Sequence, residues 1–336
     1  MKRYYWETED DAEASGQESK GGQPAPPVCF QTPSHTQPPG FTAVVKEGRI
    51  YGKNGAVLTS DHRLMGDMSW DWDPVKGLVY GSAHPLLKEW IPYPLERFDG
   101  TAANLAFVFS ANYFHWMFDV LPRLYLIRRN GIRIDRYIVN QDGLAFQQET
   151  LDHLGIEPEM RIHTHDRLHL CAKRLVTTTP PMAIGYPGWA CRFLRNAFLT
   201  DQDHSLINDQ KLYVTRSRAG HRRLANEEAI RRVLTERGFQ TVSLEGMPFK
   251  EQIGMFALAK CIVSCHGAGL TNLVFCRPDT KVIELFPRNF VKRYFWNISR
   301  QVGLDYHYLI GSEMNALTEF SVEEERLRLL LQTIGQ

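Results

Sequence analysis

Residues 264–272, which read SCHGAGLTN, have the composition of a phosphate-binding loop. They follow the apolar run 261–263, which is typical of the end of a strand. Gly267 and Gly269 permit a positive φ and let a ligand approach the backbone closely. Their amides, with those of a helix that starts here, would form a site for an anion such as a diphosphate. A tight turn whose glycines serve only packing is the alternative, because short Gly-x-Gly loops are common.

Basic and acidic side chains lie near the ends of two other apparent strands, residues 211–216 and 280–286. The basic ones are Arg216, Arg218, Arg222 and Arg223. Guanidinium groups there can make bidentate contacts with phosphate, although a solvated basic loop would have the same composition. Glu284 can accept hydrogen bonds from ribose hydroxyl groups or form an ordinary salt bridge. Because the carboxyl ends of parallel strands meet at one edge, these groups predict a pocket for a nucleoside diphosphate.

A histidine and an aspartate occur in the strongly apolar and aromatic first half, NYFHWMFDVL, of a helix predicted at residues 112–130. His115 and Asp119 are four residues apart and therefore lie on one helical face. Buried polar groups need partners or a polar cleft. The two side chains are therefore either a general base with its orienting partner or a buried pair that only holds the helix in place.

The sequence gives little support for a metal site. The Asp-x-Asp triplets at residues 71–73 and 201–203 have the form of carboxylate metal motifs, but such triplets arise often by chance. Cys261 and Cys265 are four residues apart with no second pair nearby. We therefore expect buried thiols there rather than zinc ligands.

The elements that position these residues form two series in which strands alternate with helices, which predicts two α/β halves with parallel sheets and a cleft between them. The first series has a helix at 112–130, interrupted at Pro122, a strand at 135–140, a helix at 144–154 and a strand at 174–180. The second has strands at 211–216, 239–244, 261–265 and 280–286 and helices at 227–237 and 248–260.

The sequence also predicts the structure of the first 100 residues and the starts of two helices. Residues 1–40 are polar and rich in Pro, Gly, Ser and Gln, which predicts a loose arm, and 41–100 predict short strands and hairpins. Asn226 is expected to cap the helix at 227–237. Ser321 and Glu324 fit a capping box for a final helix.

Composition narrows the class of protein. The length of 336 residues suits two domains, and a net charge of +1 argues against a nucleic-acid binder that relies on an overall basic field. Six cysteines in a chain of this length are not a disulfide framework. The sequence has no apolar run of 18 residues, and its N-terminus lacks the apolar stretch of a secretory signal. We therefore expect a cytoplasmic protein.

Four segments in this order resemble glycosyltransferase family 61, most of all its bacterial members described as capsular polysaccharide biosynthesis proteins. They are NYFHWMFDVLPRL (112–124), LYVTRSRAGHRRLANEEAI (212–230), SLEGMPFKEQIGMFALAKCIVSCHGAGLTNLVF (243–275) and VIELFP (282–287). The resemblance implies a GT-B fold, in which two Rossmann-like α/β domains face each other across a cleft. It divides the chain into a flexible arm (1–40), an acceptor-side domain (41–200), a nucleotide-sugar-binding domain (201–312) and a C-terminal helix (313–336).

The resemblance also implies roles for individual residues. The loop that would line the donor phosphates comprises Gly267, Ala268, Gly269, Leu270, Thr271 and Asn272. Arg216 and either Arg222 or Arg223 would pair with the diphosphate, and Glu284 would meet the ribose. Glu245 would help to shape the donor site. His266 would orient the glycine loop, touch the diphosphate or have a structural role.

The function that this resemblance implies is that of an inverting glycosyltransferase without a metal or cofactor. It would move a sugar from a nucleotide-sugar, with uridine as the first choice of base, to a glycan or lipid-linked acceptor in capsular or surface polysaccharide synthesis. Asp119 or His115 would take the proton of the acceptor hydroxyl, and arginines and amides would stabilise the leaving diphosphate. No nucleic-acid partner is expected.

Two rival functions and one alternative location stay open. A non-catalytic nucleotide-sugar-binding or assembly protein could use the same scaffold. A dinucleotide-dependent oxidoreductase is the weaker rival, because the three-glycine fingerprint is missing. Residues 287–300 mix Lys292, Arg293 and Arg300 with aromatic side chains. They suit either a peripheral contact with the inner membrane face or a helix that packs on the core with its charges outside.

Overall fold

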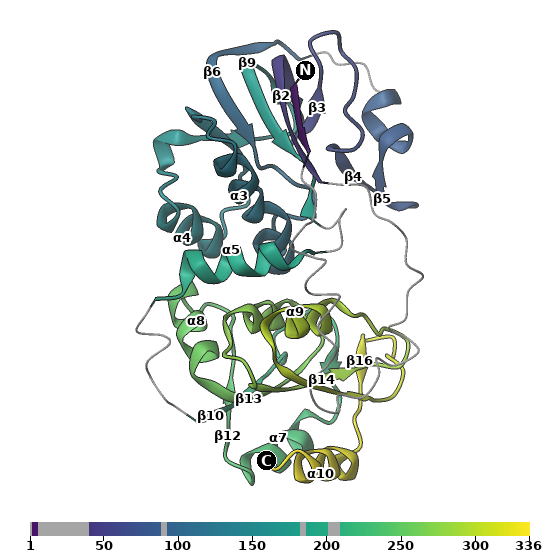
Figure 1. Cartoon of the computed structure of the whole chain (residues 1–336). Coiled ribbons are helices and arrows are strands. Elements are labelled where there is room, and N and C mark those ends of the chain that lie inside the picture. Colours follow the sequence, from purple (N-terminus) through teal and green to yellow (C-terminus); the bar gives the residue numbers. More distant parts are fainter. Residues whose placement is uncertain (1, 6–39, 89–92, 182–185, 201–208) are drawn as a thin grey trace. The chain divides into compact units, whose positions relative to one another are not determined.

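The computed structural model describes residues 2–5, 40–88, 93–181, 186–200 and 209–336, and these form two compact units (Figure 1). Described residues up to Phe193 belong to the first unit, and those from Leu194 onward belong to the second. The division falls inside helix α5 (Gly188–Phe198). Both units combine sheets with helices, so the α/β class expected from the sequence is confirmed.

A mixed sheet with the strand order β1-β2-β9-β6-β7-β8 forms the centre of the first unit, and β3 pairs with β2. Strands β6, β7, β8 and β9 run parallel, as the alternation of strands and helices predicted. Strand β2 is antiparallel to β9 and extends the sheet. The strands are β1 (Lys2–Tyr5), β2 (Phe41–Tyr51), β3 (Ala56–Leu58), β6 (Glu96–Asn104), β7 (Arg136–Asn140), β8 (Arg161–Thr164) and β9 (His169–Thr178).

Hairpins account for the region before β6, as its turn signals predicted. The turn between β2 and β3 contains Gly55 at φ 70°, a conformation that favours glycine. A separate two-stranded hairpin consists of β4 (Trp70–Asp73) and β5 (Gly77–Tyr80), whose turn contains Pro74. Two short 3₁₀ turns, η2 (Gly81–Ala83) and η3 (Pro85–Lys88), follow it.

The interruption predicted at Pro122 is a change of helix type rather than a break. A short turn, α2 (Tyr113–His115), continues into a π-helical turn, η4 (Trp116–Val120), and then into α3 (Pro122–Arg129). The amide of Leu121 donates to the carbonyl of Trp116 at 3.0 Å, which closes the wide turn. Pro122 begins α3 directly after this π-helical turn. Helix α4 (Ala145–His153) and the 3₁₀ turn η5 (Pro158–Met160) complete the unit.

The second unit contains a parallel sheet with the strand order β12-β10-β13-β14-β15. Its strands are β10 (Gln210–Val214), β12 (Phe239–Val242), β13 (Ala259–Cys265), β14 (Lys281–Phe286) and β15 (Asp305–Ile310). Sequential strands proceed outward in opposite directions from β10 and β13. The topological switch point, where open α/β sheets bind ligands, therefore lies between the carboxyl ends of these two strands.

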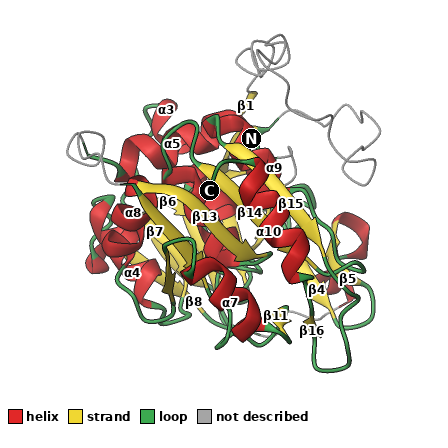
Figure 2. Ribbon diagram, turned by 90° about the horizontal axis from the view of Figure 1, so that it is seen from below, coloured by secondary structure: helices red, strands yellow, loops and turns green. Residues whose placement is uncertain are grey.

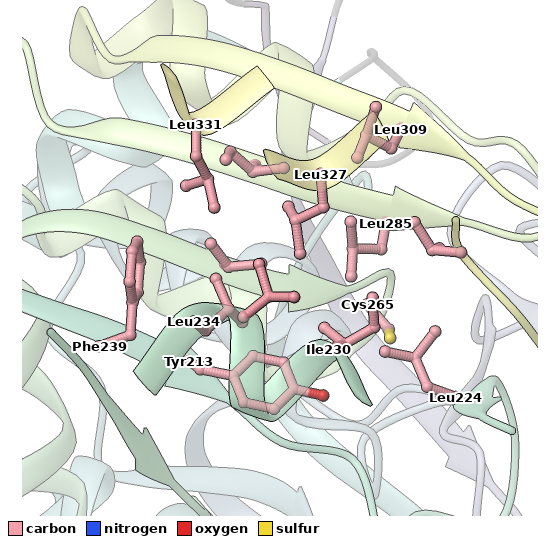
Figure 3. Packing of buried hydrophobic residues seen from close by; sticks show 14 of the residues in the cluster. Tyr213, Leu224, Ile230, Leu234, Phe239, Cys265, Leu285, Leu309, Leu327 and Leu331 are labelled. Carbon is pink, nitrogen blue, oxygen red and sulfur yellow. The ribbon is translucent and has the colours of Figure 1, made fainter. Parts of the chain in front are cut away.

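Helices cover both faces of this sheet. Figure 3 shows α7 (Glu227–Thr235) and α10 (Glu324–Thr333) contributing Leu234 and Leu327 to a buried cluster with Tyr213 of β10 and Leu285 of β14. Helix α9 (Tyr294–Val302) lies on the other face, where it contacts the 3₁₀ helix η7 (Ala268–Phe275). Helix α8 (Phe249–Leu258) also contacts η7. Figure 2 shows the helices in red and the strands in yellow.

Of two helix-capping predictions, one is confirmed in position and the other is wrong. Asn226 occupies the N-cap position of α7, as predicted, but its side chain makes no capping hydrogen bond to the helix. It bonds instead to the backbone of Val322, with Nδ2 donating to the carbonyl at 2.8 Å. Helix α10 begins at Glu324 with Glu323 at the N-cap, so Ser321 does not form a capping box. Both positions lie just after the paired strands β11 (Arg223–Leu224) and β16 (Glu319–Phe320).

Some predicted features lie outside the described residues. These include most of the arm at 1–40, of which only residues 2–5 and 40 are described, and the triplet at 201–203. None of the described helices combines the length and the apolar composition needed to cross a bilayer.

Candidate functional site

The switch point of the second unit brings Arg216 and Gly267 together. Arg216 follows β10 and Gly267 follows β13, and the two strands are adjacent in the sheet (Figure 1). The guanidinium of Arg216 donates from Nη2 to the carbonyl of His221 at 2.9 Å, which fixes it over the loop. The sequence prediction that Arg216 and the glycine loop share one edge of the sheet thus agrees with this geometry.

The reason for glycine at position 267 differs from the predicted one. Gly267 has φ 177°, which is extended backbone, and Gly269 is not among the described glycines with a positive φ. A Cβ atom added to Gly267 would instead lie 1.8 Å from Nη1 of Arg216. The expected close approach to the backbone is therefore present, and the group that makes it is the arginine side chain.

Arg222 forms a second positive charge beside Arg216. Its Nε donates to the carbonyl of His266 at 2.9 Å, and its guanidinium lies 4.9 Å from the ring centre of Phe290. Burial lowers the pKa of Arg216, and burial together with the charge of Arg216 lowers the pKa of Arg222. Among the described residues neither arginine forms an ion pair with a carboxylate. Two crowded guanidinium groups held by carbonyls favour binding of an anion.

The structure separates the four arginines of the loop by environment. Arg223 donates to Glu319 at 2.6 Å, in an ion pair that joins β11 to β16. Arg218 is exposed. Arg222 rather than Arg223 is therefore the companion of Arg216 at the switch point. Its φ of 56° places it in the left-handed region, which is uncommon for an arginine and turns its side chain toward the loop after β13.

His266 and Glu284 form a buried pair beneath this loop. Nδ1 of His266 lies 2.5 Å from Oε1 of Glu284, and Tyr306 donates its hydroxyl to Oε2 at 2.5 Å. The Glu284 side chain is 0% exposed, so both of its oxygens serve protein groups and it lies below the surface that a ribose would meet. The salt-bridge alternative for Glu284 matches this placement. The ring of His266 is also stacked on Phe286, at 5.2 Å between centres.

The remaining predicted donor residues fall into two groups. Leu270, Thr271 and Asn272 are buried in η7, where Asn272 donates to Oε1 of Gln252 at 2.9 Å. Only the start of the loop, at Ala268 and Gly269, is half-exposed. Glu245 is exposed after β12, and its charge acts on Arg216 without a contact at ion-pair distance. The loop can thus present amides to a ligand, whereas its last three side chains stabilise the unit.

His115 and Asp119 of the first unit form a hydrogen-bonded pair. Nδ1 of His115 lies 2.7 Å from Oδ2 of Asp119. Asp119 is 0% exposed, whereas the His115 side chain is 21% exposed. With a proton on Nδ1 directed at the carboxylate, Nε2 of His115 is the atom able to accept a proton from outside. The geometry assigns the outer position to the histidine and the inner, orienting position to the aspartate.

Two further side chains surround Asp119. Tyr186 donates its hydroxyl to Oδ2 at 3.4 Å. Arg123 is buried, and it donates from Nη1 to the carbonyl of Ala106 at 3.2 Å. Burial lowers the pKa of Arg123 to about 10, and the charge of Asp119 opposes that shift. The carboxylate is therefore stabilised by a buried cation as well as by hydrogen-bond donors.

The described residues contain no cluster of three or more His, Cys, Asp and Glu side chains that could hold a metal ion. Asp71 accepts from Nδ2 of Asn54 at 2.6 Å, and Asp73 accepts from the amides of Val75 and Lys76 at 2.8 Å. This triplet therefore shapes a hairpin. Cys261 and Cys265 are buried thiols in β13, as expected from the sequence.

Sequence reasoning missed several residues of these sites. Tyr306 comes from β15, a strand that was not predicted although Asp305–Ile310 is aromatic and apolar. Phe290 lies in the segment for which a membrane contact was considered, and it packs beside His266 at 5.6 Å between ring centres. Phe109 and Tyr186 contact His115 and Asp119 from outside the helix that carries them. No local spacing relates these side chains to their partners.

Comparison with known proteins identifies the family. The family model for glycosyltransferase 61 matches residues 113–283, just over half of the chain. A beta-1,2-xylosyltransferase of Arabidopsis thaliana is 31% identical over 104 residues, which are 30% of this chain and 19% of that protein. Beta-1,2-xylosyltransferase XAX1 of Oryza sativa subsp. japonica is 30% identical over 137 residues, which are 38% of this chain and 24% of that protein.

A third relative, beta-1,2-xylosyltransferase RCN11 of the same rice, is 41% identical over 61 residues, 18% of this chain and 11% of that protein. The aligned segments thus cover less than a quarter of the length of these relatives. The family match includes both arginines, the glycine loop and the His115–Asp119 pair. The chain belongs to the glycosyltransferase 61 family.

Proposed function

We propose that this chain is an inverting, metal-independent glycosyltransferase that moves a sugar from a nucleotide-sugar to a glycan acceptor. The observation that carries the proposal is the pair Arg216 and Arg222 at the switch point beside Gly267. Both guanidinium groups are half-buried, and neither has a carboxylate partner among the residues that the structure describes. A nucleoside diphosphate supplies the negative charge that this arrangement favours. Its leaving-group charge would be stabilised by these side chains and the loop amides.

The names of the relatives support a particular donor. They are beta-1,2-xylosyltransferases, so UDP-xylose is the first donor to test and a sugar 2-hydroxyl group is the first acceptor. A β-linked product from an α-linked nucleotide-sugar requires inversion at the anomeric carbon. The acceptor oxygen forms the new bond to that carbon as the bond to the diphosphate breaks, and the acceptor proton must go to a base.

The proposed base is His115, with Asp119 as its orienting partner. His115 is the more exposed of the two and has Nε2 directed away from the 2.7 Å bond to Asp119. The buried carboxylate would stabilise the imidazolium that forms. This assignment is part of a GT-B model in which the first unit supplies the acceptor side, the second binds the donor and a cleft lies between them.

The biological setting is expected from the sequence resemblance alone. The matched relatives are plant proteins and give no support to the capsular role expected from the sequence, which stays a prediction. A cytoplasmic location and a peripheral membrane contact also stay predictions. In residues 287–300, Phe290 and Phe295 pack on His266, and this packing matches the core-packing alternative for that segment.

The test is thermal stabilisation of the purified chain by UDP, GDP, ADP and UDP-xylose, with and without EDTA. A ligand at 100 times its Kd adds about 2.7 kcal/mol to the free energy of unfolding. We expect stabilisation by uridine nucleotides that EDTA leaves unchanged and that Arg216→Ala and Arg222→Ala abolish. Arg218→Ala is the matched control, because it removes an exposed arginine from the same loop.

Transfer assays then separate an enzyme from a binding protein. Release of UDP from UDP-xylose that depends on an added glycan, together with a β-linked product, supports the proposal. Stabilisation by nucleotide without transfer to any glycan would favour the non-catalytic binding protein. Loss of binding in EDTA would contradict the metal-independent mechanism.

A further inference from the structure

One face of the hairpin β4–β5 consists mainly of aromatic side chains. Trp70 is opposite Tyr80 and Trp72 is opposite Leu78 in the antiparallel register, so these four side chains share one face. The intervening Val79 points to the other face and is buried. The hairpin thus packs on the first unit through Val79, while Trp72 and Tyr80 are largely exposed and Trp70 is half-buried.

The outward rings are exposed to an unusual degree. Trp72 is 53% exposed and Tyr80 is 55% exposed. Trp70 stacks on Tyr80, with 4.8 Å between ring centres and 22° between planes. Single exposed apolar side chains are ordinary, but adjacent exposed aromatic rings on one face are typical of a binding surface.

This face is continuous with the proposed base. The ring of Trp72 meets that of Phe109 edge-on at 5.7 Å between centres. Phe109 lies 4.9 Å from the ring of His115. All three residues belong to the first unit. A ligand lying on the Trp72 ring would extend toward His115 across Phe109.

Hydrogen bonds hold the hairpin in this position. Oδ1 of Asp71 accepts from Nδ2 of Asn54 at 2.6 Å and from the amide of Trp72 at 2.7 Å. Oδ1 of Asp73 accepts from the amides of Val75 and Lys76, which fixes the turn. A ring held in place before binding loses little conformational entropy when a ligand arrives.

We propose that Trp72, with Trp70 and Tyr80, binds a sugar ring of the acceptor glycan one or more residues away from the one that reacts. A pyranose has an apolar face of C–H groups and a rim of hydroxyl groups, which matches an exposed indole ring with water around it. Continuity with His115 identifies the occupant as the acceptor. The inference rests on the proposed function, and it assigns Trp72 as a specificity-determining residue.

Steady-state kinetics with UDP-xylose and acceptors from one to four sugars long tests this inference. We expect Trp72→Ala to raise the acceptor KM for the longer glycans at least tenfold, with kcat and the donor KM changed less than threefold. The shortest acceptor, which cannot reach the hairpin, should be unaffected. Trp72→Phe should restore most of the affinity. Val75→Ala, at the exposed tip of the same hairpin, is the control and should behave as wild type.

A binding measurement separates failure of this inference from failure of the proposed function. Saturation-transfer NMR with xylotetraose, mannotetraose and cellotetraose, in the presence of UDP, reports contact without turnover. Loss of the signal in Trp72→Ala supports the inference even if no transfer occurs. Binding by none of the three sugars, or equal binding by wild type and Trp72→Ala, overturns it. So does a wild-type dimer that Trp72→Ala converts to a monomer, because the occupant would then be a second copy.

Discussion

The Cβ position of Gly267 lies 1.8 Å from Nη1 of Arg216, so the arginine rather than the backbone conformation requires glycine here. The two residues follow neighbouring strands, β13 and β10, at the switch point of the sheet. A methyl group at position 267 would need the guanidinium to move. The residue at position 267 therefore determines where the Arg216 side chain can lie.

Gly267→Ala should weaken nucleotide binding at least tenfold, because Arg216 must leave its place over the loop. The free energy of unfolding should fall by about 1–3 kcal/mol, as for other overpacked sites. Isothermal titration with UDP and chemical denaturation measure the two effects. Gly254→Ala in α8, where nothing lies within 4 Å of the added Cβ, should bind normally and be stabilised by up to about 1 kcal/mol. Normal UDP binding by Gly267→Ala would contradict this account.

Tyr306→Phe should destabilise the second unit, because it leaves Oε2 of the wholly buried Glu284 without its donor. Leaving a buried charged acceptor unpaired costs about 1–3 kcal/mol or more. Urea denaturation measures this change. Tyr80→Phe, which removes an exposed hydroxyl group, should change stability by less than about 0.5 kcal/mol. Equal stability of the two variants would show that Tyr306 does not support the His266–Glu284 pair.

Local sequence signals were sufficient for most elements and for the positions at strand ends. The alternation of apolar strands with helices gave β10, β13 and β14, and hence placed Arg216 and Gly267 at one edge. Hydrogen bonds between side chains and elements that are distant in the sequence could not be predicted from these local signals. The side chain of Asn226 bonds to Val322, 96 residues later, instead of capping its own helix.

The same limit explains the candidate site. Spacing identified His115 and Asp119 as partners because both lie on one short segment. Spacing does not indicate which of the two side chains is exposed. Their exposure depends on the packing of Phe109 and Tyr186, which come from other segments. Glu284 shows a second form of this limit. Its carboxylate lies near a strand end, but it is buried and bonded to Tyr306 of β15, 22 residues later in the chain.

The buried thiol of Cys265 should make the free energy of unfolding depend on pH in the alkaline range. Burial raises the pKa of Cys265 to about 12, above its value in the unfolded chain. Between these two values the unfolded state releases a proton that the folded state keeps, so stability falls as pH rises from about 9. Cys265→Ala should flatten this fall, as measured by urea denaturation from pH 7 to 10.5. An unchanged slope in Cys265→Ala would mean that this thiol does not contribute to the pH dependence.

Substitution of the proposed base, His115, tests the catalytic role of the His115–Asp119 pair. His115→Ala should lower kcat about 10²–10⁴-fold, the usual contribution of a general base, with nucleotide binding unchanged. Asp119→Asn keeps the shape of the side chain but loses the charge that orients and stabilises the imidazolium. It should lower kcat to a similar degree, and the double variant should be little worse than either single one, because the two residues act as a unit.

Tyr186→Phe is the control for this pair. Its bond to Oδ2 of Asp119 is long, at 3.4 Å, so its loss should lower kcat less than about fivefold. Circular dichroism and the UDP affinity of each variant show whether the fold and the donor site survive. If His115→Ala turned over normally while Asp119→Asn did not, the aspartate would be the base and the exposed position of His115 would have another purpose. Normal turnover in both would leave the pair with the structural role of anchoring its helix.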